Sequence, residues 1–258
     1  MAKQSGLGDN AYVGGSTVGQ IACFDLSGDV AALTTIQGGN EPLEVAGINR
    51  SAQERIGGIR DGEISFNVWF NDATDQEHGV LSTLPTIDAH IMYCRGTSLG
   101  NQAAAMLAKQ VNYGWSRGND GSLRGSVRCL ANARGLEWGR LLTAGKRTDT
   151  GATNGSSVDD SASSTFGLAA YMQYFTFVGT SAVVKLQESS DDGVVDPYAD
   201  VTGGAFTAVT GGAVPGPERI QTSLTQTVER WLRCVTTGTF TSLVFAVTVV
   251  RHLTAVGY

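Results

Sequence analysis

Charged residues, proline and histidine are scarce in this chain of 258 residues. Only 16% of the residues are charged, and there are 5 prolines and 3 histidines. Globular proteins usually carry about 25% charged residues. The 18 basic residues are scattered along the chain, and the net charge is −6. A sequence-specific DNA-binding protein usually presents a basic face, so tight binding of phosphate is disfavoured, whereas loose contact with nucleic acid stays open.

Long apolar segments are also absent. A membrane-spanning helix needs at least about 18 consecutive apolar residues, and the longest candidate, residues 243–250, contains Thr248. Residues 1–6 lack the apolar stretch of a secretory signal. We therefore expect no membrane insertion, and we expect synthesis in a cytosol.

Cysteine is present, but not in a metal-binding or disulfide pattern. The four cysteines lie far apart and form no Cys-x-x-Cys pair: Cys23, Cys94, Cys129 and Cys234. A cytosol keeps thiols reduced. We therefore expect small buried or surface thiols, without a disulfide or a metal site.

Other candidate ligands do not cluster either. The three histidines lie at neither helical nor turn spacing: His78, His90 and His252. Four aspartates stand closer together, at Asp191, Asp192, Asp196 and Asp200. They lack the regular spacing and closing glutamate of an EF-hand. Because aspartate is common in turns, solvated turn carboxylates are the favoured interpretation.

Catalytic and nucleotide-binding motifs fail on their context. Residues 6–11 match a relaxed dinucleotide fingerprint, but that motif requires a preceding strand, so a flexible N-terminal arm is favoured. Residues 145–148 suggest a phosphate-binding loop, yet Arg140 occupies the required upstream glycine position. No Gly-x-Ser-x-Gly elbow occurs. A carboxylate pair assembled in space for glycoside hydrolysis stays open, but we expect no enzyme and predict no catalytic, cofactor-binding or metal-ligating residue.

Glycine, in contrast, is abundant. There are 34 glycines among 258 residues, about 13% against a usual share of about 7%. Glycine pairs at 14–15, 38–39 and 57–58 flank apolar runs. Two compatible interpretations are turns with positive φ and pliable loops or arms that become ordered when neighbouring subunits pack.

The composition changes around residues 146–164. This stretch, KRTDTGATNGSSVDDSASS, has Val158 as its one large apolar residue and is typical of a linker or long exposed loop. Of 26 threonines, 8 precede residue 146 and 18 follow it. We predict a first domain over 1–145, a linker over 146–164 and a second domain over 165–258.

Both domains have a mainly β pattern. In the second, β-branched and aromatic runs at 168–178, 182–187, 229–236 and 243–251 alternate with turn signals, which predicts an antiparallel β-sandwich. In the first, strands are predicted at 63–70, 89–95 and 122–130. Short helices are predicted at 50–56, with Ser51 or Asn49 as cap, and at 75–84, where Pro85 ends the helix.

Three stretches of the first domain carry a family pattern. They are SAQERIGGIRDGEISF at 51–66, VLSTLPT at 80–86 continuing to YCRG at 93–96, and GLEWG at 135–139 with LTAG at 142–145. With these residues, positions 6–146 resemble the major tail proteins, or tail tube proteins, of long, non-contractile-tailed bacteriophages, as found among phages of actinobacteria. The second domain resembles, more weakly, the β-sandwiches appended to phage tail proteins.

That resemblance implies a structural virion protein. A tail-tube-like β-sandwich or barrel would self-assemble into rings, and stacked rings would form the tail tube through which DNA is ejected. The implied partners are copies of the chain, tape-measure and tail-completion proteins, and DNA in transient, non-specific passage. No cofactor is implied. The implied location is the tail of the virion, after synthesis in the host cytoplasm.

Two other functions stay open. The alternative is a phage surface protein whose second domain binds a carbohydrate or receptor, with Trp231, Tyr171 and Tyr174 as stacking candidates. Because all three lie in apolar runs, core packing is the favoured explanation of them. The third hypothesis is a hydrolase acting on a cell-wall polymer, for which no motif is present.

Overall fold

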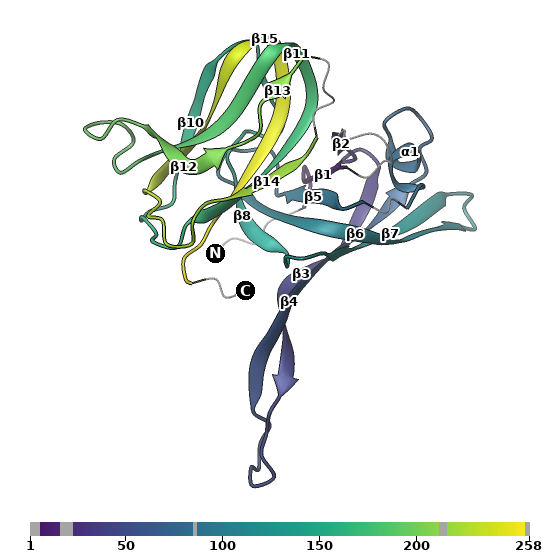
Figure 1. Ribbon diagram of the computed structural model, residues 1–258. Coiled ribbons are helices and arrows are strands. Elements are labelled where there is room, and N and C mark those ends of the chain that lie inside the picture. Colours follow the sequence, from purple (N-terminus) through teal and green to yellow (C-terminus); the bar gives the residue numbers. More distant parts are fainter. Residues whose placement is uncertain (1–5, 16–22, 85–86, 212–215, 256–258) are drawn as a thin grey trace.

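The computed structural model describes residues 6–15, 23–84, 87–211 and 216–255. These residues form antiparallel β-structure with one short helix, α1 (Figure 1), which confirms the predicted mainly β class. None of the described helical structure is long and apolar enough to cross a membrane.

The strands differ greatly in length. The first part of the chain contains β1 (Asn10–Gly14), β2 (Cys23–Asp25), β3 (Val30–Glu44), β4 (Arg55–Trp69), α1 (Glu77–Leu81), β5 (Ala89–Cys94), β6 (Gln102–Arg117), β7 (Leu123–Ala131) and β8 (Glu137–Leu141). The second part contains β9 (Arg147–Asp149), β10 (Thr153–Asp159), β11 (Leu168–Ser189), β12 (Ala199–Ala205), β13 (Val209–Thr210), β14 (Glu218–Gln221) and β15 (Trp231–Arg251).

Seven strands of the first part pair in the order β3-β4-β7-β6-β5-β1-β2. Because side chains alternate along a strand, one face of this sheet collects the apolar residues of a core. On the central strands β4 and β7 these residues are Ile64, Phe66, Val68, Val127 and Cys129. The predicted strands at 63–70, 89–95 and 122–130 lie within or overlap β4, β5 and β7.

One of the two predicted helices is present. Within the predicted range 75–84, α1 packs on the first core, and its first N–H group is fixed by Asp29. The Asp29 carboxylate accepts hydrogen bonds from the Glu77 N–H (3.1 Å) and the Asn71 side-chain amide (2.8 Å). The side chain of Glu77 is fully buried, and burial raises the pKa of its carboxyl to about 7.

The helix predicted at 50–56 is wrong. These residues form the outer end of the β3–β4 hairpin, and Arg55 already pairs with Glu44 as part of the ladder. A short helix needs a packed face for its stability, and every residue from 37 to 57 is exposed. Backbone pairing between the two strands is therefore the available source of order in this segment.

The second part of the chain is organised by β11 and β15. These strands pair over their full length, from Leu168↔Arg251 to Ser189↔Trp231. Register shifts beside Gly179 bend the pair, and Gly238 in β15 has φ 118°, a conformation that favours glycine. Both halves of each strand contribute to one core. The four predicted runs thus merge into two long strands, and residues 237–238, between two of these runs, lie inside β15.

The linker predicted at 146–164 is corrected by the structure, because β9 and β10 lie within it and both pair with β15. Arg147 holds this segment: its Nε and Nη2 donate to the Asp149 carboxylate, both at 2.8 Å, and its Nη1 donates to the Cys234 carbonyl at 2.9 Å. Pairing at a sheet edge uses the backbone and needs few apolar side chains. Composition therefore failed to identify these strands.

β8 joins the two parts of the chain. It pairs with β6 on one edge and with β15 on the other, so a single sheet runs through both parts. A third core lies beside it and takes residues from both parts, among them Tyr12, Met92, Leu141, Tyr171 and Val250. The division into domains at residue 145 stays a prediction.

A buried ion pair occupies this junction. Glu137 of β8 and Arg219 of β14 are 3% and 5% exposed, and the guanidinium donates to both carboxylate oxygens, at 2.9 and 3.0 Å. The Tyr171 hydroxyl donates to the same carboxylate, and His252 Nε2 lies 4.0 Å from it. Burial opposes ionisation of Glu137, but these three neighbours together lower its pKa to about 2.

We predict that Glu137→Gln destabilises the protein by about 3–5 kcal/mol, because Arg219 stays buried without its counter-charge. Urea unfolding at pH 7 measures this. The matched control is Glu54→Gln, which removes the exposed Arg50–Glu54 pair (3.0 Å) and should cost less than about 1 kcal/mol. Equal losses in the two variants would contradict the prediction.

The same pair predicts an acid-dependent loss of stability. Since the pKa of Glu137 falls from its ordinary 4.5 to about 2 on folding, its contribution is complete above pH 4.5 and is lost as the pH falls through about 2. The Glu137→Gln variant should lack this part of the acid dependence.

Candidate assembly surface

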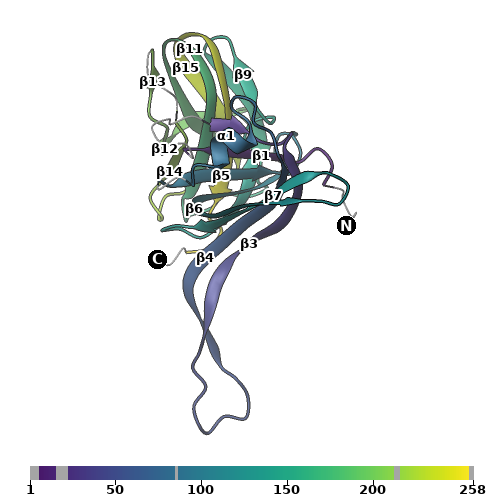
Figure 2. The same cartoon turned by 90° about the vertical axis from the view of Figure 1, so that its right-hand side faces the viewer.

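The β3–β4 hairpin extends well beyond the rest of the molecule (Figures 1 and 2). We call residues 40–60 the arm. The inner half of the hairpin packs on the first core, whereas all side chains from 37 to 57 are exposed. Among the described strands, β3 pairs with β4 alone, so its other edge has unpaired backbone groups. An unpaired edge of this length is a ready site for contact with another chain.

The arm presents apolar side chains to water. They are Leu43, Val45, Ile48, Ile56 and Ile59. Leu43 and Ile56 lie opposite each other across the two strands, and Ile48 at the tip is completely exposed. Exposed apolar surface gathered on one element marks an interaction site. A two-stranded ribbon without packing is also marginally stable in water, so the arm gains most from being covered.

Close packing fixes the base of the arm. Leu136, which precedes β8, packs directly against Gly38 and Gly62. A Cβ added at position 38 would lie 2.8 Å from the Leu136 Cβ, and one added at position 62 would lie 2.6 Å from it. Glycine at both positions permits this crossing. The glycine pairs 38–39 and 57–58 lie in β3 and β4 and do not have positive φ, so their interpretation as turns was wrong. Gly15, with φ 72°, agrees with the interpretation of pair 14–15 as a turn.

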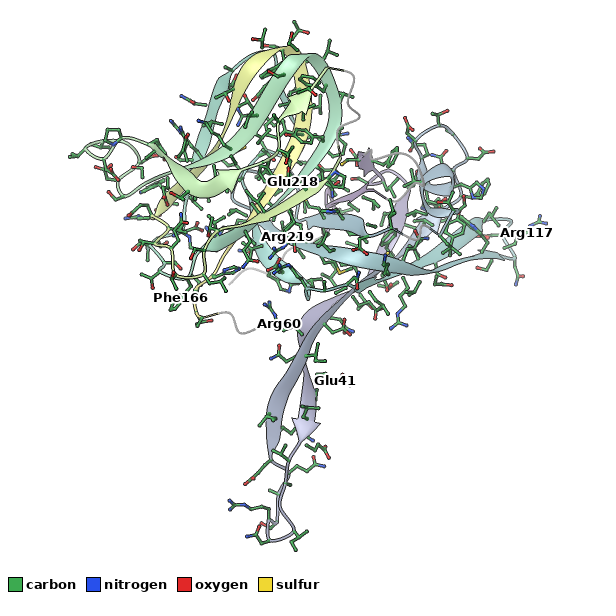
Figure 3. All side chains as sticks on the ribbon, in the orientation of Figure 1. Glu41, Arg60, Arg117, Phe166, Glu218 and Arg219 are labelled. Atoms are coloured by element: carbon green, nitrogen blue, oxygen red, sulfur yellow. The ribbon has the colours of Figure 1, made fainter. Side chains whose placement is uncertain are left out.

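A cavity of about 490 Å³ lies at the base of the arm. Leu43, Ile59 and Ala133 give it an apolar lining, Glu41 adds one anion, and Arg60 and Arg134 add two cations. Figure 3 shows Glu41 and Arg60 where the arm leaves the body. We call this the arm-base cavity.

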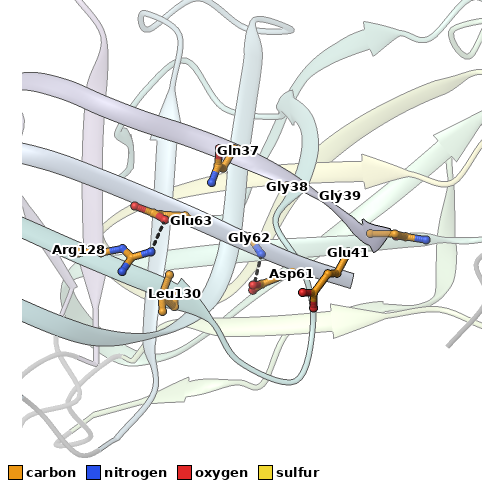
Figure 4. A pocket seen from close by; sticks show the side chains of 10 residues that line it. Gln37, Gly38, Gly39, Glu41, Asp61, Gly62, Glu63, Arg128 and Leu130 are labelled. Atoms are coloured by element: carbon orange, nitrogen blue, oxygen red, sulfur yellow. Dashed lines mark hydrogen bonds and ion pairs between the residues drawn. The ribbon is translucent and has the colours of Figure 1, made fainter. Parts of the chain in front are cut away.

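The outer face of β4 and β7 is polar, and we call it the polar face. Its polar side chains are Glu63, Ser65, Asn67, Arg124, Ser126 and Arg128, and the strand pairing places Leu130 and Trp69 on the same face. Arg128 Nη2 lies 2.9 Å from Glu63 Oε2 (Figure 4), and this bond lowers the pKa of the Glu63 carboxyl. Arg124 lies 4.6 Å above the Trp69 ring and 3.9 Å from Asp120. Both arginines therefore have an acidic neighbour.

The residues considered as metal or acid–base groups form no common site. All four cysteines are free and buried, which is one of the two placements that the sequence left open. His78 Nδ1 lies 2.7 Å from the Tyr113 hydroxyl, His252 lies beside Glu137, and burial lowers the pKa of His90 to about 4. In the part of the chain that the structure describes, no three His, Cys, Asp or Glu residues are placed to bind a metal ion.

The aspartates of the loop between β11 and β12 have a structural role. The Asp191 carboxylate accepts hydrogen bonds from the N–H groups of Val194, Val195 and Asp196, at 2.7–3.1 Å. Asp192 and Gly193 follow with positive φ. This is the predicted turn, with its carboxylates used to order the loop.

The three stacking candidates do not meet on one surface. Tyr171 and Tyr174 are 2% and 3% exposed and belong to different cores. Trp231 is half-buried beside the Arg230 guanidinium, which lies 5.3 Å from its ring. The core interpretation is therefore correct for both tyrosines, and no aromatic platform for a sugar is assembled from these residues.

The remaining motifs have no site around them. Residues 1–5 of the expected N-terminal arm lie outside the described residues, and from Asn10 the chain forms β1, which is paired on both edges. Residues 145–148 turn into β9. Sequence reasoning missed the arm as a surface. The sequence feature that could have revealed the arm is the presence of five apolar residues in a segment that was not assigned to a core.

Comparison with known proteins gives structural likenesses only. No known family model matches the chain, and no curated protein matches it. The chain is similar to a protein from the tail of an empty gene transfer agent particle, with 15% identity over 53% of this chain and 98% of that chain and a TM-score of 0.40.

Two further likenesses span nearly the whole chain. The SPP1 Dit protein, from the hub adsorption apparatus of phages that infect Gram-positive bacteria, is 12% identical over 95% of this chain and 99% of that chain, with a TM-score of 0.34. A chain of the phage p2 baseplate in its activated conformation is 10% identical over 95% and 98%, with a TM-score of 0.31. These structural neighbours are thus tail and baseplate proteins. All three TM-scores are below 0.5, so these likenesses do not define the function of this chain.

Proposed function

We propose that this protein is a structural component of a phage tail, which self-assembles through its arm into rings that stack as the tail tube. The arm carries the proposal, because it exposes apolar side chains and an unpaired strand edge that a second copy would cover. Closed rings leave no strand edge free. The sequence resemblance gives support, since residues 51–66 form the returning strand of the arm and residues 135–139 brace its base.

The polar face is the surface that we assign to the channel. It offers paired charge and small polar groups, and proteins bind DNA non-specifically through unpaired basic groups that displace counterions. A channel lined in this way lets DNA pass transiently during ejection. Tape-measure and tail-completion proteins are the other partners in this proposal, the virion tail is the location, and catalysis has no part in it.

Replacing the arm tests this function. Asn40 and Arg60 are paired, so residues 41–59 can be replaced by Asn-Gly, a two-residue hairpin turn. The wild-type chain should form rings or tubes in negative-stain electron microscopy and sediment as a large species. The shortened chain should be monomeric, with its thermal unfolding midpoint nearly unchanged because the deleted side chains are largely exposed.

The control for this experiment removes exposed apolar groups elsewhere. Val194 and Val195 are 80% and 84% exposed in the loop between β11 and β12, and changing both to Ser should leave assembly intact. Rings or tubes formed by the arm-less chain would refute the proposal.

Glu63→Gln tests the channel face. This variant removes the charge that neutralises Arg128, so assembled protein should retain duplex DNA more strongly at low salt, and the excess should disappear as salt rises. Asp159→Asn frees Arg230, which precedes β15 and lies outside the polar face and the arm, and is the matched control. Equal DNA retention by both variants, measured by filter binding across a salt series, would remove the polar face from the channel.

A further inference from the structure

The arm-base cavity and the tip of the arm are complementary in chemistry. The cavity has apolar walls from Leu43 and Ile59, and the tip presents Ile48, which is fully exposed. Both surfaces carry charges of each sign. The cavity carries one carboxylate, Glu41, and two guanidinium groups, Arg60 and Arg134, and the tip carries one cation and one anion in its Arg50–Glu54 pair. Glu41 and Arg60 form no ion pair with any residue that the structure describes.

A chain cannot place its own tip in its own cavity. The two strands of the arm are held in register at Leu43↔Ile56 and Glu44↔Arg55, and the Val45 N–H continues the pairing by donating to the Glu54 carbonyl. Ile48 stands five residues beyond Leu43, which at about 3.3 Å per residue is roughly 16 Å along the ribbon. A tip that docks in this cavity must therefore belong to another molecule.

We propose that the tip of the arm of one copy docks in the arm-base cavity of the next copy, with Ile48 against Leu43 and Ile59. This inference rests on the proposed self-assembly and names its contact. Donor and acceptor surfaces differ, so the contact is heterologous and repeats from copy to copy, which produces closed rings or an extending tube. Arg50 and Glu54 of the docked tip then face Glu41 and Arg60 of the receiving copy.

Two single variants and their mixture test this contact. Ile48→Arg brings a cation to a cavity that Arg60 and Arg134 already line, and Ile59→Asp places a carboxylate where an apolar tip must dock, so each variant alone should fail to assemble. In an equimolar mixture, the basic tip of the first variant can dock against the carboxylate introduced into the cavity of the second. The unchanged tip of the second variant can dock in the unchanged cavity of the first. Assembly should therefore return in the mixture, with the two variants alternating.

The control is Val194→Asp, an exposed apolar residue away from the arm, which should assemble like the wild type. Circular dichroism confirms that each variant is folded, and sedimentation velocity at matched concentration measures assembly. Ile48 and Ile59 are both largely exposed, so neither change should affect folding.

Each outcome either supports or overturns the contact between the tip of the arm and the cavity. Recovery in the mixture supports it. Normal assembly by either single variant overturns the contact and leaves the proposed function standing. Loss of assembly in both variants without recovery in the mixture also overturns it, because the two positions then act at separate interfaces. A monomeric wild-type chain overturns both this contact and the proposed function.

Discussion

Residues 135–141 are the constraint on which the rest of the structure depends. Leu136 crosses the base of the arm at Gly38 and Gly62, β8 pairs with strands of both parts of the chain, and Glu137 forms the buried ion pair with Arg219. One short segment therefore fixes the direction of the arm, connects the two parts of the sheet and holds β14 in position. A buried ion pair contributes little net stability but strongly penalises arrangements that separate the charges. The pair thus selects one orientation of the two parts.

This arrangement gives the arm a rigid origin and a free end. Its base is packed between Leu136 and the first core, whereas its outer part is exposed throughout residues 40–57. In the proposed assembly, low charge density elsewhere would let copies approach closely, and the ion pairs Arg50–Glu54 and Arg55–Glu44 on the arm would limit repulsion between them. The glycine excess is partly explained by this design, since glycines at 38, 58 and 62 permit close approach of chain segments at the arm.

The sequence predicted local structure well where one face of a strand is buried. Alternation at Ile64, Phe66 and Val68 correctly placed β4, and the helical range that ends before Pro85 contains α1. It failed where order comes from backbone pairing without burial. β9 and β10 carry almost no apolar side chains, and the arm does not pack on the body of the protein. Neither segment therefore has the alternation of buried and exposed residues by which a strand is recognised in a sequence. The ion pair at Glu137 could not be predicted from the sequence either, because Tyr171, Arg219 and His252, which surround its carboxylate, are far from it in the chain.

The central claim is that the arm is covered by a neighbouring copy. Hydrogen exchange of the wild-type chain, followed from dilute monomer to assembled particle, tests it most directly. Amides of residues 40–60 should exchange rapidly in the monomer and become protected as assembly proceeds, while exchange in the loop at 190–198 stays unchanged. Assembled particles in which the amides of the arm exchange as fast as in the monomer would contradict it.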